Sequence, residues 1–450
     1  MHCFKRLIKI SLILMLTVGV VCSCCSCGIE SSATTIATTF TETFFTEDLG
    51  ILKGYEFKNE KNEEVLEKAV SLFSVSVDYA TLKAYSNFLD STFSSSVITR
   101  AEWLSQLLTK LDFEIITDKS DDYARVLDKD YFDYSEYFIT AIENSIIGPN
   151  SSEFDPYCAV TRQYVSTSLI NAVGYPRTYK LKCSDYKKIE DKTQAAASVH
   201  LGFFELDENN RFNPYGTVNE DQIDYILSEL DKLKVLKNKT VMTFGDSIMH
   251  GDGNYFVGIA DMLSQRYLMT PIDYSKGGST FGRVTNRQQI TSQISRASNE
   301  NEIADIILIN GGTNDMRKSK PGSISDDFDY EKYGCEDFCS GMEYALRTLK
   351  DYYPDTPVVY IRVHNMEYGI ERNELHFGNL ALDICEKWDI DVVDIFNETD
   401  FNTHDKEQKN IYTVHTKTCK NGDSIHPNKL GYYKFYIPLI SEKAVEILGE

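Results

Sequence analysis

Apolar and polar residues follow two different periods from Lys239 to Glu450. Short apolar runs of strand length alternate with longer stretches in which apolar residues recur every three or four positions. The predicted strands are Thr240–Phe244, Ile272–Ser275, Asp305–Asn310, Pro357–Val363 and Ile390–Phe396. The predicted helices are Tyr255–Tyr267, Gln288–Ala297, Glu336–Tyr352, Glu374–Trp388 and Lys434–Leu448. This alternation is typical of a doubly wound parallel sheet with helices on both faces.

The preceding part of the chain has a mainly helical pattern, from about Gly54 to Leu236, as in Asn62–Phe73 and Thr99–Leu111. The segment Lys232–Asn238 is polar and rich in lysine, so it can serve as a junction. We therefore expect a mainly α-helical domain over residues 54–236 and an α/β domain over residues 237–450.

A short string recurs in the helical half. Phe154–Thr161 is matched by Phe212–Asn219, and a degenerate copy ends at Val97–Glu102. Helix-like stretches flank the copies, namely Tyr137–Ile147, Arg162–Val173, Gln194–Leu201 and Glu220–Leu233. The half is thus predicted to consist of repeats.

These strings resemble S-layer-homology repeats, in which a Phe-x-Pro loop leads into a Thr-Arg-Ala-Glu helix start. The resemblance implies binding of cell-wall polysaccharide, with Arg100 and Arg162 contributing to the glycan site. A simpler interpretation is also open. Thr99 and Glu102 fit a capping box, and both arginines can be solvated residues of a first helical turn.

The first residues have the features of an export signal. Basic residues precede the apolar stretch Ile10–Val21, which is too short to span a bilayer as a stable helix. Val21-Cys22-Ser23-Cys24 resembles a bacterial lipobox, which implies a lipid anchor on Cys24; a plain secretory signal is the alternative. We expect a leader over residues 1–27, a Thr- and Ser-rich linker over residues 28–53, and a location at the cell surface with membrane contact only through the lipid.

Composition narrows the range of partners. The net charge of −22, from 46 basic and 68 acidic residues, opposes binding to nucleic acids and to anionic membrane surfaces. Cys335 and Cys339 have helical i, i+4 spacing, but no nearby Cys or His completes a four-ligand set. We predict no nucleic-acid partner, no metal site and no cofactor.

Two polar strings have the chemistry of a nucleophile and its base. Gly245-Asp246-Ser247 follows the first strand directly, and Asp423-Ser-Ile-His426-Pro427 lies near the other end of the chain. A serine hydroxyl becomes a useful nucleophile when an imidazole accepts its proton and a carboxylate fixes that imidazole. We expect Ser247 to be the nucleophile, His426 the general base and Asp423 the group that orients it. Gly-Asp-Ser by itself also fits an ordinary turn.

Two further strings, Lys276–Thr280 and Asn310–Asp315, also follow predicted strands. The carboxamide of Asn314 can donate a hydrogen bond to an oxyanion, and a glycine can bring a backbone N–H close to a ligand. The residues themselves leave Gly277 and Gly278 as competing donors. The sequence lacks a Gly-x-Ser-x-Gly elbow, because Met249 occupies the last position, which argues against the ordinary α/β-hydrolase fold.

Together, the four strings in this order resemble the SGNH (GDSL-type) hydrolase family over nearly all of the C-terminal half, with Ile248 in place of the usual Leu. The resemblance implies a three-layer, flavodoxin-like fold and ester hydrolysis through Ser247, His426 and Asp423. It also implies an oxyanion hole made by the N–H groups of Ser247 and Gly278 and by Asn314.

The expected activity is that of an exported serine esterase. The favoured substrates are acyl esters, above all acetyl esters, of a carbohydrate or cell-wall polymer. Two alternatives remain: a glycan-binding surface protein with a silent hydrolase-like domain, and a lipase-type enzyme for longer acyl chains.

Overall fold

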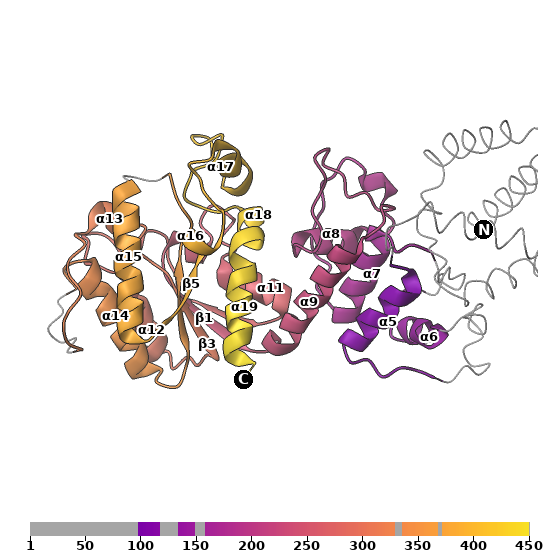
Figure 1. The fold of residues 1–450 in the computed structure, drawn as a ribbon, viewed down its shortest axis with the longest axis horizontal. Coiled ribbons are helices and arrows are strands. Elements are labelled where there is room, and N and C mark those ends of the chain that lie inside the picture. Colours follow the sequence, from indigo (N-terminus) through magenta and orange to yellow (C-terminus); the bar gives the residue numbers. More distant parts are fainter. Residues whose placement is uncertain (1–97, 118–133, 149–157, 329–334, 368–370, 450) are drawn as a thin grey trace, which may run out of the picture. The chain divides into compact units, whose positions relative to one another are not determined.

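A computed structural model describes residues 98–117, 134–148, 158–328, 335–367 and 371–449 (Figure 1). The predicted leader with Cys24, the linker and the predicted helix Asn62–Phe73 lie outside these residues. The chain divides into two compact units, Met1–Ala195 with Leu206–Tyr225, and Ala196–Glu205 with Ile226–Glu450. Within the described part of the chain, no helix has the length and apolar character needed to cross a membrane. No group of three His, Cys, Asp or Glu side chains suited to a metal ion occurs there either.

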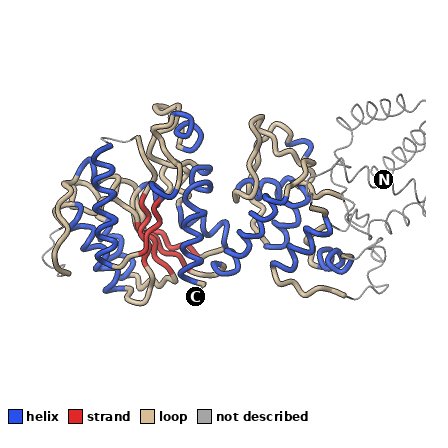
Figure 2. The backbone as a smooth tube through the Cα atoms, in the orientation of Figure 1, coloured by secondary structure: helices blue, strands red, loops and turns tan. Residues whose placement is uncertain are grey.

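The second unit is built around a parallel five-stranded sheet with the strand order β2-β1-β3-β4-β5 (Figure 2). Its strands are β1 (Thr240–Phe244), β2 (Thr270–Asp273), β3 (Ile306–Ile309), β4 (Val358–Arg362) and β5 (Asp391–Asp394). All four strand pairs are parallel, in registers such as Val241 with Ile306 and Ile307 with Val358. The predicted α/β fold is confirmed.

Helices cover both faces of this sheet. On one face, α12 (Ile290–Asn299), α14 (Phe338–Tyr352) and α15 (Glu371–Trp388) share a single apolar core with side chains of β1, β3 and β4. On the other face lie α11 (Ile259–Tyr267) and α19 (Ile437–Leu448), as Figure 1 shows. The strands β3 and β4 are buried along their whole length because apolar layers lie on both sides.

Several element boundaries differ from the sequence-based prediction. The predicted strand Ile390–Phe396 is β5 followed by α16 (Ile395–Glu398), because the Asp394 carboxylate caps the new helix by accepting from the backbone N–H of Asn397. The predicted helix Tyr255–Tyr267 begins only at Ile259. Shorter elements complete the unit: α10 (Ser247–His250), α13 (Asp315–Lys318), α17 (Lys406–Tyr412), α18 (Lys429–Gly431) and a π-helical turn, η6 (Tyr432–Tyr436).

The preceding described residues are mainly helical, as expected. The helices are α5 (Arg100–Lys110), α6 (Ser135–Glu143), α7 (Arg162–Val173), α8 (Lys192–His200) and α9 (Glu220–Leu236), with a 3₁₀ turn, η4 (Tyr186–Lys188). The last part of α9 and residues 196–205 belong to the sheet-containing unit, whereas the sequence analysis placed them in the helical domain.

The described residues at the ends of the three copies lie at the starts of three helices. The side chains of Thr99, Thr161 and Asn219 accept N-capping hydrogen bonds at the starts of α5, α7 and α9. Antiparallel bridges join the copies, Thr99 with Ala159 and Thr161 with Thr217. The expected capping box of Thr99 and Glu102 is present. The sequence repeat is therefore also a structural repeat.

Candidate active site

Ser247 lies at the carboxyl end of the sheet, where the chain leaves β1. A side chain at Gly245 would place its Cβ 1.9 Å from the carboxamide oxygen of Asn310, so only glycine fits this exit. Asp246 then caps α10 by accepting from the backbone N–H of Ile248 at 3.0 Å. As a result, Ser247 is the first residue of a short helix and is only 7% exposed.

The structure brings Ser247, His426 and Asp423 together. The Nε2 atom of His426 lies 2.9 Å from Ser247 Oγ, and its Nδ1 atom lies 2.6 Å from Asp423 Oδ2. The other carboxylate oxygen of Asp423 accepts the backbone N–H groups of Ile425 and His426. With Nδ1–H donating to the carboxylate, Nε2 is free to accept the hydroxyl proton of Ser247.

The charges in this cluster favour a basic imidazole. Burial would lower the pKa of His426, but the hydrogen bond and the negative charge of Asp423 outweigh burial and raise it above its usual value. Burial would in turn raise the pKa of Asp423, yet its bonds to His426 hold that pKa below its usual value. The pair therefore behaves as a proton acceptor with an ionised partner.

The expected oxyanion-hole residues lie in two adjoining loops. Asn314 precedes α13, and its amide donates to the backbone oxygen of Ser279 at 3.0 Å. A carboxamide carries two N–H groups, and this bond engages one of them. Gly278 has a φ of +80°, a conformation that other residues rarely adopt. The loop that contains Gly277 and Gly278 is thereby tied to the loop that contains Asn314.

Residues 243–434 match the family described as GDSL-like Lipase/Acylhydrolase. They form a GDSL-like acylhydrolase domain. The protein is accordingly an ester hydrolase. No curated protein sequence matches the chain.

Several solved structures resemble about half of the chain. A protein from Lactobacillus plantarum is 19% identical, with coverage of 47% of this chain and 97% of that one and a TM-score of 0.37. Est24, a carbohydrate acetylesterase from Sinorhizobium meliloti, is 14% identical, with coverage of 47% and 100% and a TM-score of 0.33. The psychrotrophic esterase EstA from Pseudoalteromonas is 17% identical, with the same coverages and a TM-score of 0.32.

The acylhydrolase domain also uses residues that the sequence analysis did not assign. Gln293 on α12 is buried and joins the nucleophile loop to the glycine loop. Its carboxamide accepts from Gly245 N at 2.8 Å and donates to Gly245 O at 2.9 Å and to Ser279 Oγ at 3.0 Å. No local pattern marks this glutamine, because its role depends on the packing of α12 against β1.

Asp315 is a second such residue. Its carboxyl group accepts the backbone N–H groups of Phe281 at 3.1 Å and Gly282 at 2.8 Å, so it fixes the end of the glycine loop. Burial raises the pKa of Asp315 to about 7, which the two backbone donors only partly offset. Asp315 belongs to the string Asn310–Asp315 that the sequence singled out, but the sequence did not reveal its hydrogen bonds to Phe281 and Gly282.

A second histidine–carboxylate pair lies near the nucleophile. His250, the last residue of α10, places Nδ1 2.6 Å from Asp252 Oδ1. In this pair the aspartate follows the histidine by two residues, whereas Asp423 precedes His426 by three. Ser247 Oγ lies 2.9 Å from Nε2 of the other histidine, His426.

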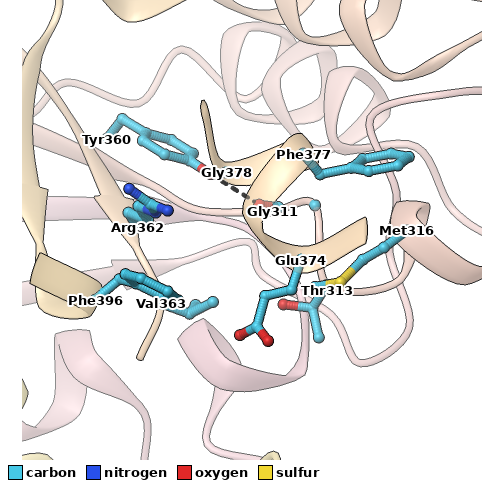
Figure 3. A pocket seen from close by; sticks show the side chains of 11 residues that line it. Gly311, Thr313, Met316, Tyr360, Arg362, Val363, Glu374, Phe377, Gly378 and Phe396 are labelled. Carbon is cyan, nitrogen blue, oxygen red and sulfur yellow. Dashed lines mark hydrogen bonds between the residues drawn. The ribbon is translucent and has the colours of Figure 1, made fainter. Parts of the chain in front are cut away.

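A pocket opens behind the loop Gly311–Thr313, at the carboxyl end of β4 (Figure 3). The hydroxyl of Tyr360 donates to the backbone oxygen of Gly311, and Arg362 pairs with Asp394 at 3.2 Å. Neither Ser247 nor His426 lines the pocket. The hydrogen bond from Tyr360, at the wall of the pocket, holds the loop that precedes Asn314.

The two arginines predicted as glycan ligands have partners within the first unit. The guanidinium of Arg100 lies 5.1 Å from the ring centre of Tyr164. The Nε atom of Arg162 donates to the backbone oxygen of Phe212 at 2.7 Å. Both side chains therefore help to hold neighbouring repeat copies together, which the sequence analysis did not anticipate.

Proposed function

We propose that this protein is an exported serine esterase that removes acyl groups, preferentially acetyl groups, from a carbohydrate or cell-wall polymer. The observation that carries the proposal is the contact of 2.9 Å between His426 Nε2 and Ser247 Oγ, with Asp423 hydrogen-bonded to the opposite ring nitrogen. Ser247 can serve as the nucleophile, His426 as the base and Asp423 as the carboxylate that orients the base, which is the arrangement that acyl transfer requires.

The first half of the reaction acylates Ser247. As Oγ attacks the ester carbonyl carbon, its proton passes to His426 Nε2, and Asp423 stabilises the resulting imidazolium. The negative charge on the carbonyl oxygen is received by the N–H groups of Ser247 and Gly278 and by the Asn314 amide. The bond to the alcohol then breaks, and His426 returns the proton to the departing alcohol.

The second half releases the acid. Water takes the place of the alcohol, and His426 accepts a proton as the water oxygen attacks the acyl carbon. Collapse of this intermediate breaks the acyl–Ser247 bond and returns the proton to Oγ. The products are a carboxylic acid and the free hydroxyl group of the polymer, and the chain's own residues supply every proton transfer.

The rest of the chain supports an insoluble or surface-bound carbohydrate as the substrate. The sequence begins with the features of an export signal, and the net charge of −22 opposes close approach to anionic lipid. The repeat copies of the first unit add a candidate wall-binding element to the same chain as the esterase. In this proposal, Cys24 bears the lipid anchor and the repeats contact wall polysaccharide.

Attachment is tested separately from catalysis. Purified cell walls should co-sediment the full chain, and Cys24→Ala should move the protein from the membrane fraction to the soluble fraction of the host. Absence of wall binding would remove the repeat part of the proposal, and membrane retention of the Cys24 variant would remove the anchor. Neither outcome affects the esterase.

The esterase itself is tested by p-nitrophenyl acetate and acetylated xylan. We predict that the wild-type protein hydrolyses both and that Ser247→Ala lowers kcat by about 10⁴-fold or more, because the variant lacks the hydroxyl that contacts His426 Nε2. Ser292→Ala, at an exposed position on α12, is the matched control and should keep full activity. Equal turnover by wild type and Ser247→Ala would contradict the proposal. A preference for p-nitrophenyl octanoate would instead favour a lipase.

A further inference from the structure

Two neighbouring aromatic side chains, Tyr255 and Phe256, are exposed on the loop that follows the nucleophile helix. Tyr255 is 92% exposed and Phe256 is 68% exposed. Most other aromatic side chains of this unit are buried, Tyr267 and Phe281 among them. Exposed apolar side chains that lie together, beside a reactive group, are typical of a binding surface.

The loop holds these rings outward in an uncommon backbone conformation. Tyr255 and Phe256 have φ angles of 56° and 58°, although neither is glycine. Asn254, only 8% exposed, fixes the loop from beneath by donating its backbone N–H to Gly251 O at 2.9 Å and its side-chain amide to Val257 O at 2.9 Å. Strained conformations persist where surrounding bonds enforce them, and they concentrate at functional sites.

The same loop contacts both α10, which carries Ser247, and the segment that precedes His426. The backbone N–H of Asp252 donates to Ser247 O at 2.9 Å. A Cβ at Gly253 would lie 3.0 Å from the side chain of Val414, and the N–H of Val414 donates to His426 O at 2.9 Å. The loop thus contacts both the helix of the nucleophile and the segment of the base.

The aromatic pair is also coupled to a polar group. The ring of Phe256 lies 5.3 Å from the ring of His250, which is hydrogen-bonded to Asp252. A ligand that stacks on the two rings would therefore lie close to the polar side chains of His250 and Asp252. An apolar face with polar groups at the rim matches the two sides of a sugar ring, whose C–H face stacks on aromatic rings while its hydroxyl groups form hydrogen bonds.

We propose that Tyr255 and Phe256 form a sugar-stacking subsite that positions an acylated carbohydrate for attack by Ser247. This inference rests on the proposed esterase function, and it identifies two residues that would recognise a carbohydrate as the substrate. A long acyl chain is a poorer occupant, because such a chain needs enclosure and both rings are open to water. The subsite binds the alcohol part of the ester, so it affects polymer substrates and not small esters.

Substitution by asparagine tests the subsite without adding strain, since asparagine tolerates the left-handed conformation. We expect Tyr255→Asn and Phe256→Asn each to raise KM for acetylated xylo-oligosaccharides about tenfold, equivalent to about 1.4 kcal/mol, with kcat nearly unchanged. Tyr255→Trp, which keeps a ring, should retain wild-type KM. Tyr352→Asn, at an exposed tyrosine on α14, is the control and should have no effect.

Hydrolysis of p-nitrophenyl acetate separates this inference from the proposed function. We expect the asparagine variants to keep wild-type kcat/KM on that small ester, whose turnover depends on Ser247. An equal loss on both substrates would show that the loop only supports the site, and an unchanged KM for the oligosaccharides would show that the rings do not bind sugar. A loss confined to p-nitrophenyl octanoate would identify an acyl-chain subsite. Each of these three results would overturn the inference. A wild-type protein that hydrolyses the small ester but not the acetylated oligosaccharide would also overturn it, while leaving the esterase activity in place.

Discussion

In the proposed mechanism, the reactivity of Ser247 depends on the charge state of one side chain, His426. The imidazole must be neutral to accept the serine proton, and Asp423 raises its pKa by hydrogen bonding and by charge. A raised pKa makes the base stronger, but it also keeps the imidazole protonated, and inactive as a base, to a higher pH. The same carboxylate therefore sets both the strength of the base and the acid limit of activity.

The raised pKa of His426 predicts the pH dependence of kcat/KM. Activity on p-nitrophenyl acetate should fall as pH decreases through a midpoint above about 6.5, the ordinary value for histidine. Asp423→Asn should move that midpoint to lower pH and reduce kcat by about 10³–10⁴-fold, because the neutral amide neither stabilises the imidazolium nor selects the tautomer. A midpoint that stays in place in Asp423→Asn would show that another group controls the profile.

At the scale of elements, the candidate active site combines the loops after β1, β2 and β3 with the segment of Asp423 and His426. Buried side chains join these loops from behind: Gln293 links the β1 exit to Ser279, and Asp315 binds Phe281 and Gly282. The loops of the proposed oxyanion hole are thus positioned by buried groups that lie behind them.

We expect Asp315→Ala to lower the free energy of unfolding by about 2–4 kcal/mol, because it leaves two buried backbone N–H groups without an acceptor. Asp315→Asn keeps one acceptor oxygen and should lose less. Urea denaturation followed by circular dichroism measures both. Equal stability of Asp315→Ala and wild type would mean that water replaces the carboxylate.

The sequence predicted those parts of the site that depend on local chain geometry. Ser247 at a strand exit and the turn from Asp423 to His426 are encoded within a few residues, and so is the capping box of Thr99 and Glu102. Gln293 has no such local signal, because its partners lie in other segments. The helix predicted from Tyr255 was wrong at its start, since apolar spacing cannot reveal that Asn254 fixes these residues in a left-handed loop.

At the scale of the whole molecule, the sheet-containing unit extends beyond the acylhydrolase match of residues 243–434. A buried ion pair explains why. Arg266 on α11 places Nε 2.9 Å from Glu229 of α9 and donates to the backbone oxygen of Leu201 at 2.9 Å. The segments 196–205 and 226–236 are therefore part of this unit, although the sequence analysis set its start at residue 237.

Removal of the Glu229 carboxylate should be costly because Arg266 remains buried. We predict that Glu229→Ala lowers the free energy of unfolding by about 3–5 kcal/mol. Burial would raise the pKa of Glu229, but Arg266 and Lys232 lower it, so the pair stabilises the fold above the ordinary pKa of about 4.3. That contribution is lost as pH falls through the lowered pKa. Urea denaturation at pH 7 and at pH 3 tests this prediction. The difference in unfolding free energy between wild type and Glu229→Ala should be smaller at pH 3.

Covalent trapping of the nucleophile tests the central claim most directly. A p-nitrophenyl phosphonate ester should add one phosphonyl group to the wild-type protein, located on Ser247 by peptide mass spectrometry, with loss of esterase activity in proportion to labelling. His426→Ala should slow this labelling by several orders of magnitude, because the hydroxyl then lacks its proton acceptor. Complete inactivation with the label on a residue other than Ser247, or equally fast labelling of His426→Ala, would contradict the account.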